Sequence, residues 1–183
     1  MEPRSPSDYF DAGMGLLARG GVAAVTIARL CDALGVTKGS FYHHFRGVED
    51  FKSQMLTHWS QERQQQAVAA ADAVVDPFER LDILREAGIG LHHEAEVAIR
   101  AWSRTDPGAW KVREAVDAAR ERVVADAYRE VGVEPAVAEL LGRLSVAVLV
   151  GVQHRRGEID RAELRAMYVL LQQMAAASHV PTR

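Results

Sequence analysis

Five polar side chains within one short segment share one kind of chemistry. They are the side chains of Lys38, Ser40, Tyr42, His43 and His44. Each carries an N–H or O–H group that donates hydrogen bonds to phosphate oxygens or to the edges of nucleic-acid bases. Thr37 precedes them and is a residue type that caps helices, so we expect a helix over residues 38–44 with these donors outside. Such a helix fits the major groove of DNA.

Two short helices and a glycine turn are predicted to hold these donors in place. Thr26 caps a helix predicted over residues 27–34, and Gly35 ends it because a tight turn there requires a residue that tolerates positive φ. An earlier helix, from about Ser7 to Arg19, ends at the Gly20-Gly21 pair. The apolar residues that would pack the three helices together are Ile27, Leu30, Cys31, Leu34, Val36 and Phe41. The pattern therefore predicts a helix-turn-helix.

The segment from Thr26 to Phe45 resembles the helix-turn-helix of the TetR/AcrR family of repressors. The matching features are Gly20-Gly21 after the first helix, Thr26 as a cap, Leu34-Gly35-Val36 at the turn, the run Lys38-Gly39-Ser40-Phe41-Tyr42-His43-His44-Phe45, and the acidic pair Glu49-Asp50. The strong part of the resemblance covers about residues 9–56. Beyond it, only the number and length of the helices agree with the family.

The resemblance implies a role for individual positions. Thr26 and Thr37 would bind phosphates through hydroxyls or backbone amides, and Tyr42 and His44 would also contact phosphates. Lys38, Gly39, Ser40 and His43 would face the bases, and Lys52 would reach the DNA backbone. The predicted DNA contacts are Thr26, Thr37, Lys38, Gly39, Ser40, Tyr42, His43, His44 and Lys52. Two positions depart from the family: Val48 stands where the family often has a basic or polar residue, and Ile27-Ala28 stand where relatives sometimes have a base-reading arginine. Recognition of the bases would therefore depend more on the 38–44 helix.

The composition predicts an all-α protein with a small and a larger domain. Apolar residues make up 48% of the 183 residues, and no run alternates strictly between apolar and polar. About nine helices are expected. Beyond residue 44 they cover about 48–73, 77–93, 94–103, 107–131, 135–154, and a last one that Asp160 caps and that runs to about Ser178. We expect a DNA-binding domain at 1–50 and a ligand-binding and dimerisation domain at 51–183.

The distribution of charge is compatible with DNA binding. The formal net charge of −3 counts against a nucleic-acid partner. From Gly13 to Gly47, however, four basic residues stand against one acid, which gives +3 without the histidines. No signal peptide is expected, and the longest apolar run, Leu144 to Val152 apart from Ser145, is about half the length that spans a bilayer. We expect a cytoplasmic protein with no membrane partner.

The sequence offers little support for catalysis or for a metal. It contains no nucleophile–base pair, phosphate-binding loop or paired metal-ligand motif, so we expect no enzyme. The single cysteine, Cys31, excludes a disulfide within the chain and is expected to be a small core residue. His93 and Glu96 could share a helix face, but a metal site needs three or four ligands. No metal or cofactor is predicted.

Trp102 and Trp110 flank a turn at Asp106-Pro107 and admit two interpretations. They pack in a core, or they form the wall of a small-molecule site. In the family that residues 9–56 resemble, the ligand pocket lies among the helices that this region of the chain would supply. The resemblance therefore implies a pocket for an unidentified inducer. The residues expected to line it are Leu91, His92, Ile99, Trp102, Trp110 and Tyr128.

The helix expected over residues 135–154 has apolar residues on every side from Leu144 onward, so it must be covered all round. If this helix and the last one paired with the same helices of a second copy around a twofold axis, the remaining apolar surface would be buried. Gly142 and Gly151 are small enough to let two such helices approach closely. The alternative is the central core helix of a monomer. The predicted interface consists of Leu141, Leu144, Val148, Leu149, Val152, Leu164, Met167, Leu171 and Met174.

Together with the resemblance, these features predict a homodimeric repressor. It would bind a palindromic double-stranded operator and release it when a small-molecule inducer binds the helical body. Two alternatives stay open: an activator or architectural DNA binder without inducer, and a helical enzyme or carrier that only resembles the family. A body without a cavity would favour the first, and undetectable DNA binding at low salt would favour the second.

Overall fold

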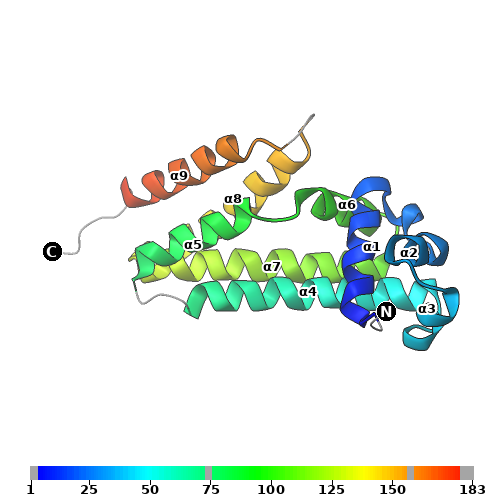
Figure 1. Cartoon of the computed structure of the whole chain (residues 1–183). Coiled ribbons are helices and arrows are strands. Elements are labelled where there is room, and N and C mark those ends of the chain that lie inside the picture. Colours follow the sequence, from blue (N-terminus) through cyan, green and yellow to red (C-terminus); the bar gives the residue numbers. More distant parts are fainter. Residues whose placement is uncertain (1–3, 73–75, 156–158, 178–183) are drawn as a thin grey trace. The chain divides into compact units, whose positions relative to one another are not determined.

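The structure is a computed structural model that describes residues 4–72, 76–155 and 159–177. Regular structure in these ranges is helical throughout, which confirms the all-α prediction (Figure 1). The elements are α1 Pro6–Gly20, the 3-10 turn η1 Val22–Ala24, α2 Ile27–Leu34, α3 Lys38–His44, α4 Val48–Asp72, α5 Pro77–Ile89, α6 His93–Ser103, α7 Pro107–Glu130, α8 Pro135–Gln153 and α9 Arg161–Ala177.

Capping residues decide where most of the helices begin. Thr26 Oγ1 accepts a hydrogen bond from the N–H of Arg29 at 3.3 Å, and Thr37 Oγ1 accepts one from Ser40 at 3.4 Å. One boundary differs from the prediction, because α5 ends at Ile89 instead of near His93. His92 Nδ1 accepts from the N–H of Ala95 at 3.4 Å and so caps a new helix. Histidine is a rare cap, which is why the pattern of residues does not reveal this boundary.

The chain packs as two compact units. The first comprises the chain up to Glu62 together with His92–Glu114, and the second comprises Arg63–Leu91 and the chain from Ala115 onward. Helices α4 and α7 supply residues to both units. The assignment of DNA binding to residues 1–50 and of ligand binding to 51–183 stays a prediction, since compactness alone assigns no function.

Aromatic side chains form the core of the first unit. Tyr9, Phe41 and Phe51 are fully buried, and Phe45 is nearly so. The ring centroids of Phe45 lie 5.0 Å from Phe51, 5.1 Å from Phe41 and 5.4 Å from Tyr9, within the range that aromatic pairs favour. Helix α6 packs along α1, as Figure 1 shows. Helix α6, which is distant in sequence, therefore covers the N-terminal head, the part of the first unit formed by α1, α2 and α3.

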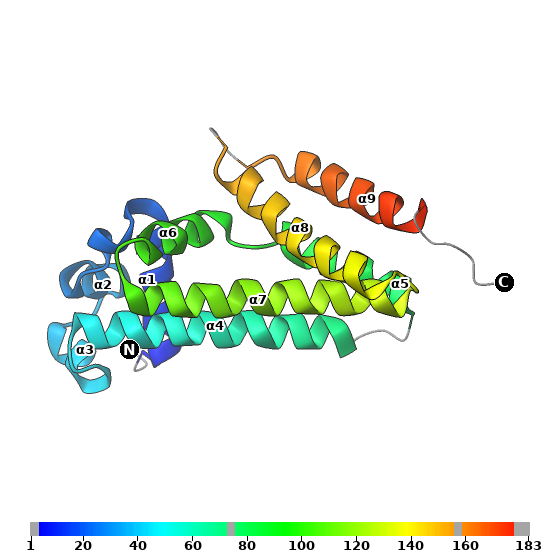
Figure 2. The ribbon, with the colours of Figure 1, turned by 180° about the vertical axis from the view of Figure 1, so that it is seen from behind.

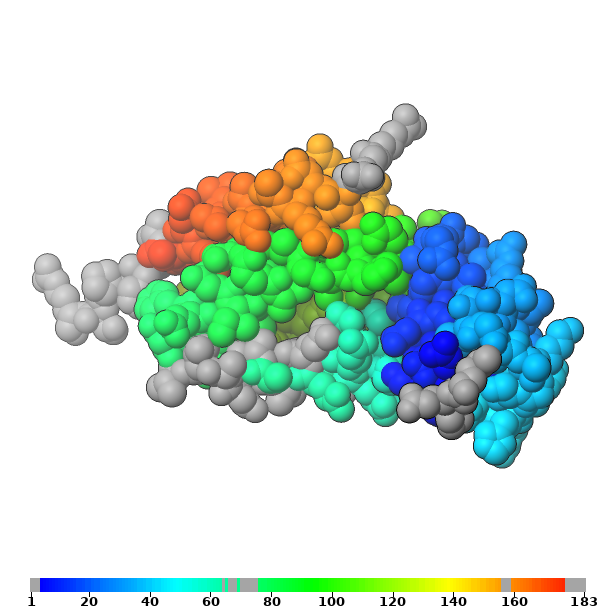
Figure 3. Space-filling model, viewed as in Figure 1, coloured from blue at the N-terminus to red at the C-terminus, as the bar shows by residue number. Residues whose placement is uncertain are grey.

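Two apolar clusters form the core of the second unit. One contains Leu81, Tyr128 and Leu141, and the other contains Leu149 and Leu164. Helix α9 packs against both α8 and α5. Figure 2 shows α8 and α9 side by side, and Figure 3 shows the orange surface of α9 lying on the green surface of α5.

Helix α8 crosses α7 at a distance that only glycine permits. A Cβ added to Gly142 would lie 2.3 Å from the backbone oxygen of Glu121 and 3.2 Å from the Cβ of Ala125. Gly142 is thus buried against α7 of its own chain, whereas the sequence suggested a close approach by a second copy. A small residue marks a close helix crossing, but the sequence does not say which helix makes it.

Within the described residues, α8 is the one helix long and apolar enough to cross a bilayer by length and composition alone. In the structure, 39% of this stretch is buried inside the protein. Leu141, Val146 and Leu149 all point into the second unit. A core helix of a folded protein passes the same test, so α8 is weak evidence for a membrane segment.

Gly35 gives a first testable prediction. It ends α2 with φ +66° and ψ +36°, in the left-handed region, and open space surrounds the position of a Cβ. A substitution is therefore strained by the backbone and not by neighbours. We expect Gly35→Val to lower the free energy of unfolding by more than about 1 kcal/mol. Urea unfolding of the full-length protein, followed by circular dichroism, measures this change.

The matched control is Gly35→Asn. Asparagine tolerates the left-handed conformation better than other residues with a Cβ, so this variant should lose less stability than the valine variant. If the valine variant were as stable as the parent, the turn at Gly35 would not depend on a positive φ.

Candidate DNA-binding head and cavity

Helices α2 and α3 form a helix-turn-helix with Gly35 at the turn. The N–H of Val36 donates to the carbonyl of Cys31 at 3.0 Å, and the N–H of Gly35 donates to that of Asp32 at 3.3 Å. The last carbonyls of α2 are thereby satisfied within the turn. These bonds fix the point from which α3 departs.

Helix α3 presents polar groups outward and one aromatic ring inward. Lys38 and His43 are exposed, and Tyr42 is 57% exposed, which is unusual for so large a ring. Phe41, between them, is fully buried in the aromatic core. Lys38, Tyr42 and His43 thus form a solvent-accessible face of hydrogen-bond donors. The buried Phe41 ring holds the opposite face of the helix in the core.

Ser40 and His44 are tied to α1. The hydroxyl of Tyr9 donates to Ser40 Oγ at 2.9 Å, and the ring centroids of Tyr9 and His44 lie 5.6 Å apart. Both α3 residues are half-buried. The contacts of α1 therefore fix where the Ser40 and His44 side chains would lie on DNA. The Ser40 hydroxyl still has its own hydrogen atom to donate.

Of the four other predicted DNA contacts, three have structural partners. Thr26 and Thr37 are exposed but serve as helix caps, which leaves their hydroxyl hydrogens for an acceptor such as a phosphate. Gly39 is exposed near the start of α3. Lys52 Nζ lies 2.8 Å from Glu49 Oε1, and the lysine side chain is only 15% exposed. A phosphate contact by Lys52 would first require this ion pair to open.

Sequence reasoning assigned no role to two exposed arginines of the head, Arg29 and Arg46. The backbone N–H of Arg46 donates to Asp50 Oδ2 at 2.9 Å, and Gln54 Nε2 donates to the same atom at 3.1 Å. These bonds, that from Arg46 first, lower the pKa of Asp50. The excess of basic residues between Gly13 and Gly47 is the sequence feature that could have identified both arginines as candidate DNA contacts.

Cys31 lies in the core of the head. It is 5% exposed, and burial raises the pKa of its thiol. A thiol with a raised pKa carries little thiolate at neutral pH and reacts slowly. Cys31 thus packs as a small apolar residue.

The second unit contains a cavity of about 110 Å³. Its wall is mostly apolar, with Leu84, Leu91 and Val124 among the lining residues. The polar lining residues are Arg63, Arg85, Arg120, Ser145, Tyr168 and Gln172. A second hollow, of about 410 Å³, shares Leu81, Tyr128 and Gln172 with the first. Convergent polar groups in an apolar cavity are typical of small-molecule sites.

The structure places the residues predicted to line a pocket in different parts of the chain. Leu91 and Tyr128 line the cavity. His92 caps α6, while Ile99 and Trp102 are buried and belong to the first unit. Trp110 also belongs to the first unit and is 48% exposed. The cavity is instead built from α5, α7, α8 and α9, with one residue of α4 and with Leu91 from the loop after α5. Apolar spacing in the sequence does not distinguish a cavity wall from a packed core.

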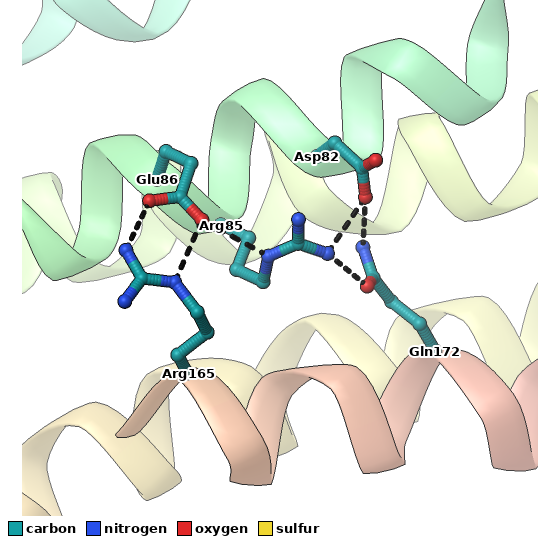
Figure 4. Close-up of polar contacts among 5 residues, drawn as sticks. All are labelled: Asp82, Arg85, Glu86, Arg165 and Gln172. Carbon is teal, nitrogen blue, oxygen red and sulfur yellow. Dashed lines mark hydrogen bonds and ion pairs between the residues drawn. The ribbon is translucent and has the colours of Figure 1, made fainter. Parts of the chain in front are cut away.

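A polar seam joins α5 to α9 beside the cavity (Figure 4). Arg85 Nη1 donates to Asp82 Oδ1 at 2.7 Å and to Gln172 Oε1 at 2.6 Å. Arg165 holds Glu86 with two hydrogen bonds, of 2.5 and 3.1 Å. Chiefly through Arg165, these contacts lower the pKa of Glu86 to about 2. Asp82, Glu86 and Arg165 are exposed to solvent, whereas the Arg85 side chain is only 17% exposed. Ion pairs between exposed groups add little stability, so the seam mainly fixes the register of the two helices.

The residues predicted to form a dimer interface fall into two groups. Leu141, Leu149, Val152, Leu164 and Leu171 are buried in the core of their own chain. Val148 and Met167 are half-buried, and Leu144 and Met174 are exposed. The exposed large apolar residues of α8 and α9 are Val137, Leu140, Leu144, Leu170 and Met174. The exposed apolar residues on these helices therefore include three that are not part of the predicted interface, Val137, Leu140 and Leu170.

Residues 10–51 match the profile of a family described as bacterial regulatory proteins, tetR family. Over 97 residues the chain is 30% identical to the HTH-type transcriptional repressor KstR2 of Mycobacterium tuberculosis. The matched segment covers 50% of this chain and 47% of that repressor. The chain thus spans about half the length of the curated relatives it matches.

Similar solved structures extend over nearly the whole chain. A putative transcriptional regulator from Saccharomonospora viridis, solved in complex with choline, has a TM-score of 0.77 at 18% identity and covers 97% of this chain and 98% of its own. The ketosteroid transcriptional regulator KstR2 of Mycobacterium tuberculosis has a TM-score of 0.66 at 20% identity, covering 94% and 96%. At such identities the likeness shows a shared fold.

Proposed function

Because the chain is a TetR-family transcriptional regulator, we propose that it is a repressor that binds a palindromic operator as a homodimer and dissociates when a small molecule binds its helical body. The observation that carries the proposal is the outer face of α3, where Lys38, Tyr42 and His43 are exposed around the buried Phe41. Such a face suits the major groove. The relatives are regulators of transcription and not enzymes, and we expect the protein to act in the cytoplasm.

The apolar surface of α8 and α9 supports the dimer. Leu140 is 59% exposed, Leu144 is 45% exposed and Met174 is 56% exposed. Large apolar side chains gathered on two adjacent helices mark a protein–protein contact. A second copy would cover them in a twofold arrangement, which is self-complementary and matches the symmetry of a palindromic operator.

The cavity supports a response to a ligand. It is bounded by α5, α7, α8 and α9, so an occupant would contact both helices of the proposed dimer surface. We infer that the ligand changes the spacing between the two heads of the dimer, which costs affinity in both half-sites. A choline complex of a regulator with this fold agrees with a body that holds small molecules.

Selection of bound sequences from random double-stranded DNA tests the proposal. The full-length protein should enrich a palindromic sequence whose half-sites lie about one helical turn, or a multiple of it, apart. Enrichment of a single, non-repeated site would contradict operator binding by a homodimer. Failure to enrich any sequence at low salt would contradict DNA binding itself.

Substitutions on α3 test which residues contact the selected operator. We expect Lys38→Ala and Tyr42→Ala each to weaken binding by about tenfold, because each removes an exposed donor worth about 1 to 2 kcal/mol. Loss of a phosphate contact should also reduce the log–log salt slope by about one for each head. Gel shifts over a salt series measure both quantities.

Two variants serve as controls for these substitutions. Tyr42→Phe removes only the hydroxyl and separates its contribution from that of the ring. Lys111→Ala removes an exposed lysine outside the helix-turn-helix and should leave affinity nearly unchanged. Unchanged affinity in both alanine variants of α3 would show that another surface reads the operator.

A further inference from the structure

We propose that the cavity of the second unit binds a small, uncharged and largely apolar molecule, one oxygen atom of which accepts a hydrogen bond from the Tyr128 hydroxyl. The inference rests on the proposed ligand response and names the chemical class of the ligand. Tyr128 lies on α7, is 3% exposed and lines the cavity. A hydroxyl group buried in this way usually has a hydrogen-bond partner in a folded protein.

The Tyr128 hydroxyl has no such partner among the residues that the structure describes. Burial alone raises the pKa of Tyr128 to about 12, so the hydroxyl keeps its proton at neutral pH. It is therefore a hydrogen-bond donor in the wall of an apolar cavity. An oxygen atom of a bound ligand, such as that of a ketone or an alcohol, would accept from it.

The other uncharged polar groups of the wall are already bonded within the protein. The Tyr168 hydroxyl donates to the carbonyl oxygen of Ser145 at 3.4 Å, and Ser145 Oγ donates to a carbonyl oxygen of its own helix at 2.8 Å. Gln172 Oε1 accepts from Arg85 Nη1 at 2.6 Å (Figure 4). Its hydroxyl thus distinguishes Tyr128 from Tyr168, the second tyrosine that lines the cavity.

The charged groups of the wall favour an uncharged ligand. Arg85 Nη1 lies 2.7 Å from Asp82 Oδ1 within the seam. Arg120 Nη1 lies 3.8 Å from Asp117 Oδ1, and Arg63 has a partner as well. These partners leave no lining arginine that needs an anionic ligand. The described lining contains no carboxylate, so a ligand cation would be buried without a counter-ion.

Tyr128 lines both hollows of the second unit, and the first of them is the more enclosed. Among the described residues that line the first, only Ala87 is exposed. The second hollow is lined in part by exposed residues, which are Phe78, Asp82, Gln173 and Ala176. A hydrogen bond to a ligand gains most where water has the least access, so we place the ligand in the first cavity.

The volume of the cavity limits the size of the ligand. About 110 Å³ holds roughly seven to eleven non-hydrogen atoms, if each occupies about the space of one water probe. The apolar part of the wall consists mainly of leucine, valine and alanine side chains. A small ketone with an apolar body fits this description, and acetophenone is a suitable probe because its rigid ring loses little conformational freedom on binding.

Isothermal titration calorimetry of the full-length protein without DNA tests the proposal. Acetophenone, α-methylstyrene, benzoate and benzamidinium have similar planar shapes and the same number of non-hydrogen atoms. Acetophenone is a neutral acceptor, α-methylstyrene has a methylene group in place of the oxygen, and the other two are an anion and a cation. We expect acetophenone to bind at least about tenfold more tightly than either ion, since an ion would bring an unmatched charge into the cavity. Equal or tighter binding of an ion, or no binding of acetophenone, would overturn the proposal.

Two tyrosine variants test the hydrogen bond. Tyr128→Phe should weaken the binding of acetophenone about threefold to tenfold, the range of a neutral hydrogen bond, and leave that of α-methylstyrene unchanged. Tyr168→Phe is the matched control, because it removes a hydroxyl of the same cavity that already has a partner. It should affect the two probes equally. Equal weakening of both probes by Tyr128→Phe, or a selective effect of Tyr168→Phe alone, would overturn the assignment to Tyr128.

Tyr128→Phe should fold like the parent, because the lost hydroxyl bonds to no described residue. Thermal unfolding followed by circular dichroism establishes this. If the variant does not fold, the comparison of acetophenone with the two ions in the unmodified protein still decides whether the cavity takes an uncharged ligand.

Two further variants locate the ligand in the first cavity. A Cβ on Gly88 would lie 3.5 Å from the Tyr168 ring, an ordinary contact, so Gly88→Ala should fold but reduce the space in the cavity. We expect it to weaken acetophenone several-fold. Gln173→Phe is the control, because Gln173 is exposed and lines only the second hollow of the two. The reverse pattern would overturn the placement of the ligand.

A separate gel shift with the selected operator distinguishes this inference from the proposed function. If acetophenone binds through Tyr128 in the calorimeter but does not release DNA, the ligand site stands and the proposed ligand response fails. If the protein binds its operator but binds no acetophenone, the repressor stands and the ligand site fails.

Discussion

Gly142→Ala is expected to lower the free energy of unfolding by about 3 kcal/mol, although alanine is the better helix former. The added Cβ would lie 2.3 Å from the backbone oxygen of Glu121. A side chain could rotate away from such a clash, but a carbonyl within α7 moves only if the whole helix moves. The helices would separate, and the apolar contacts beside the crossing, including those of Leu141, would be weakened.

Gly151→Ala is the matched control for this substitution. Gly151 lies on the same helix, is exposed, and has no atom within 4 Å of a Cβ built on it. Helix propensity should then dominate, and stability should rise by up to about 1 kcal/mol. Urea unfolding of both variants gives the comparison. Equal effects of the two substitutions would show that α8 and α7 are not in close contact at Gly142.

Paired substitutions on the apolar surface are expected to have the largest effect on DNA binding. Leu140→Glu combined with Leu144→Glu should convert the dimer to a monomer, because both exposed side chains would place charges in the proposed interface. A monomer loses the advantage of two linked heads. Operator affinity should then fall by a factor of about 10² to 10⁴. Sedimentation velocity and gel shifts at matched salt measure the two changes.

Trp110→Glu provides the control for these substitutions, since it introduces the same charge at an exposed apolar residue that belongs to the first unit. It should leave both assembly and affinity unchanged. Circular dichroism establishes that each variant is folded. A parent protein that sediments as a monomer at micromolar concentration would contradict the dimer and the mechanism based on head spacing.

The helix-turn-helix was predictable from the sequence because its determinants are local. Thr26 and Thr37 cap their helices through bonds to residues three positions later, and Gly35 adopts the positive φ that its turn requires. Each of these features depends on a few consecutive residues. The start of α6 was harder to predict, because its cap is a histidine and not one of the usual capping residues.

Features that depend on contacts between distant segments were not predictable in the same way. The cavity brings together Gly88, Arg120, Ser145 and Tyr168, which are far apart in the chain and show no common spacing. Apolar periodicity marks Leu141 and Leu144 alike, yet one is buried in its own core and the other is exposed. All three tryptophans, at 59, 102 and 110, belong to the first unit, so an aromatic-rich sequence did not indicate the cavity.

The packing of α6 on α1 has a consequence for protein engineering. Exchanging the heads of such regulators by joining chains near residue 50 would separate α1 from the helix that covers it in this protein. The transplanted head would expose an apolar surface unless the recipient supplied a compatible α6. A chimera that carries residues 92–114 along with the head should retain a native head, whereas a cut at the end of the motif should give a poorly soluble hybrid.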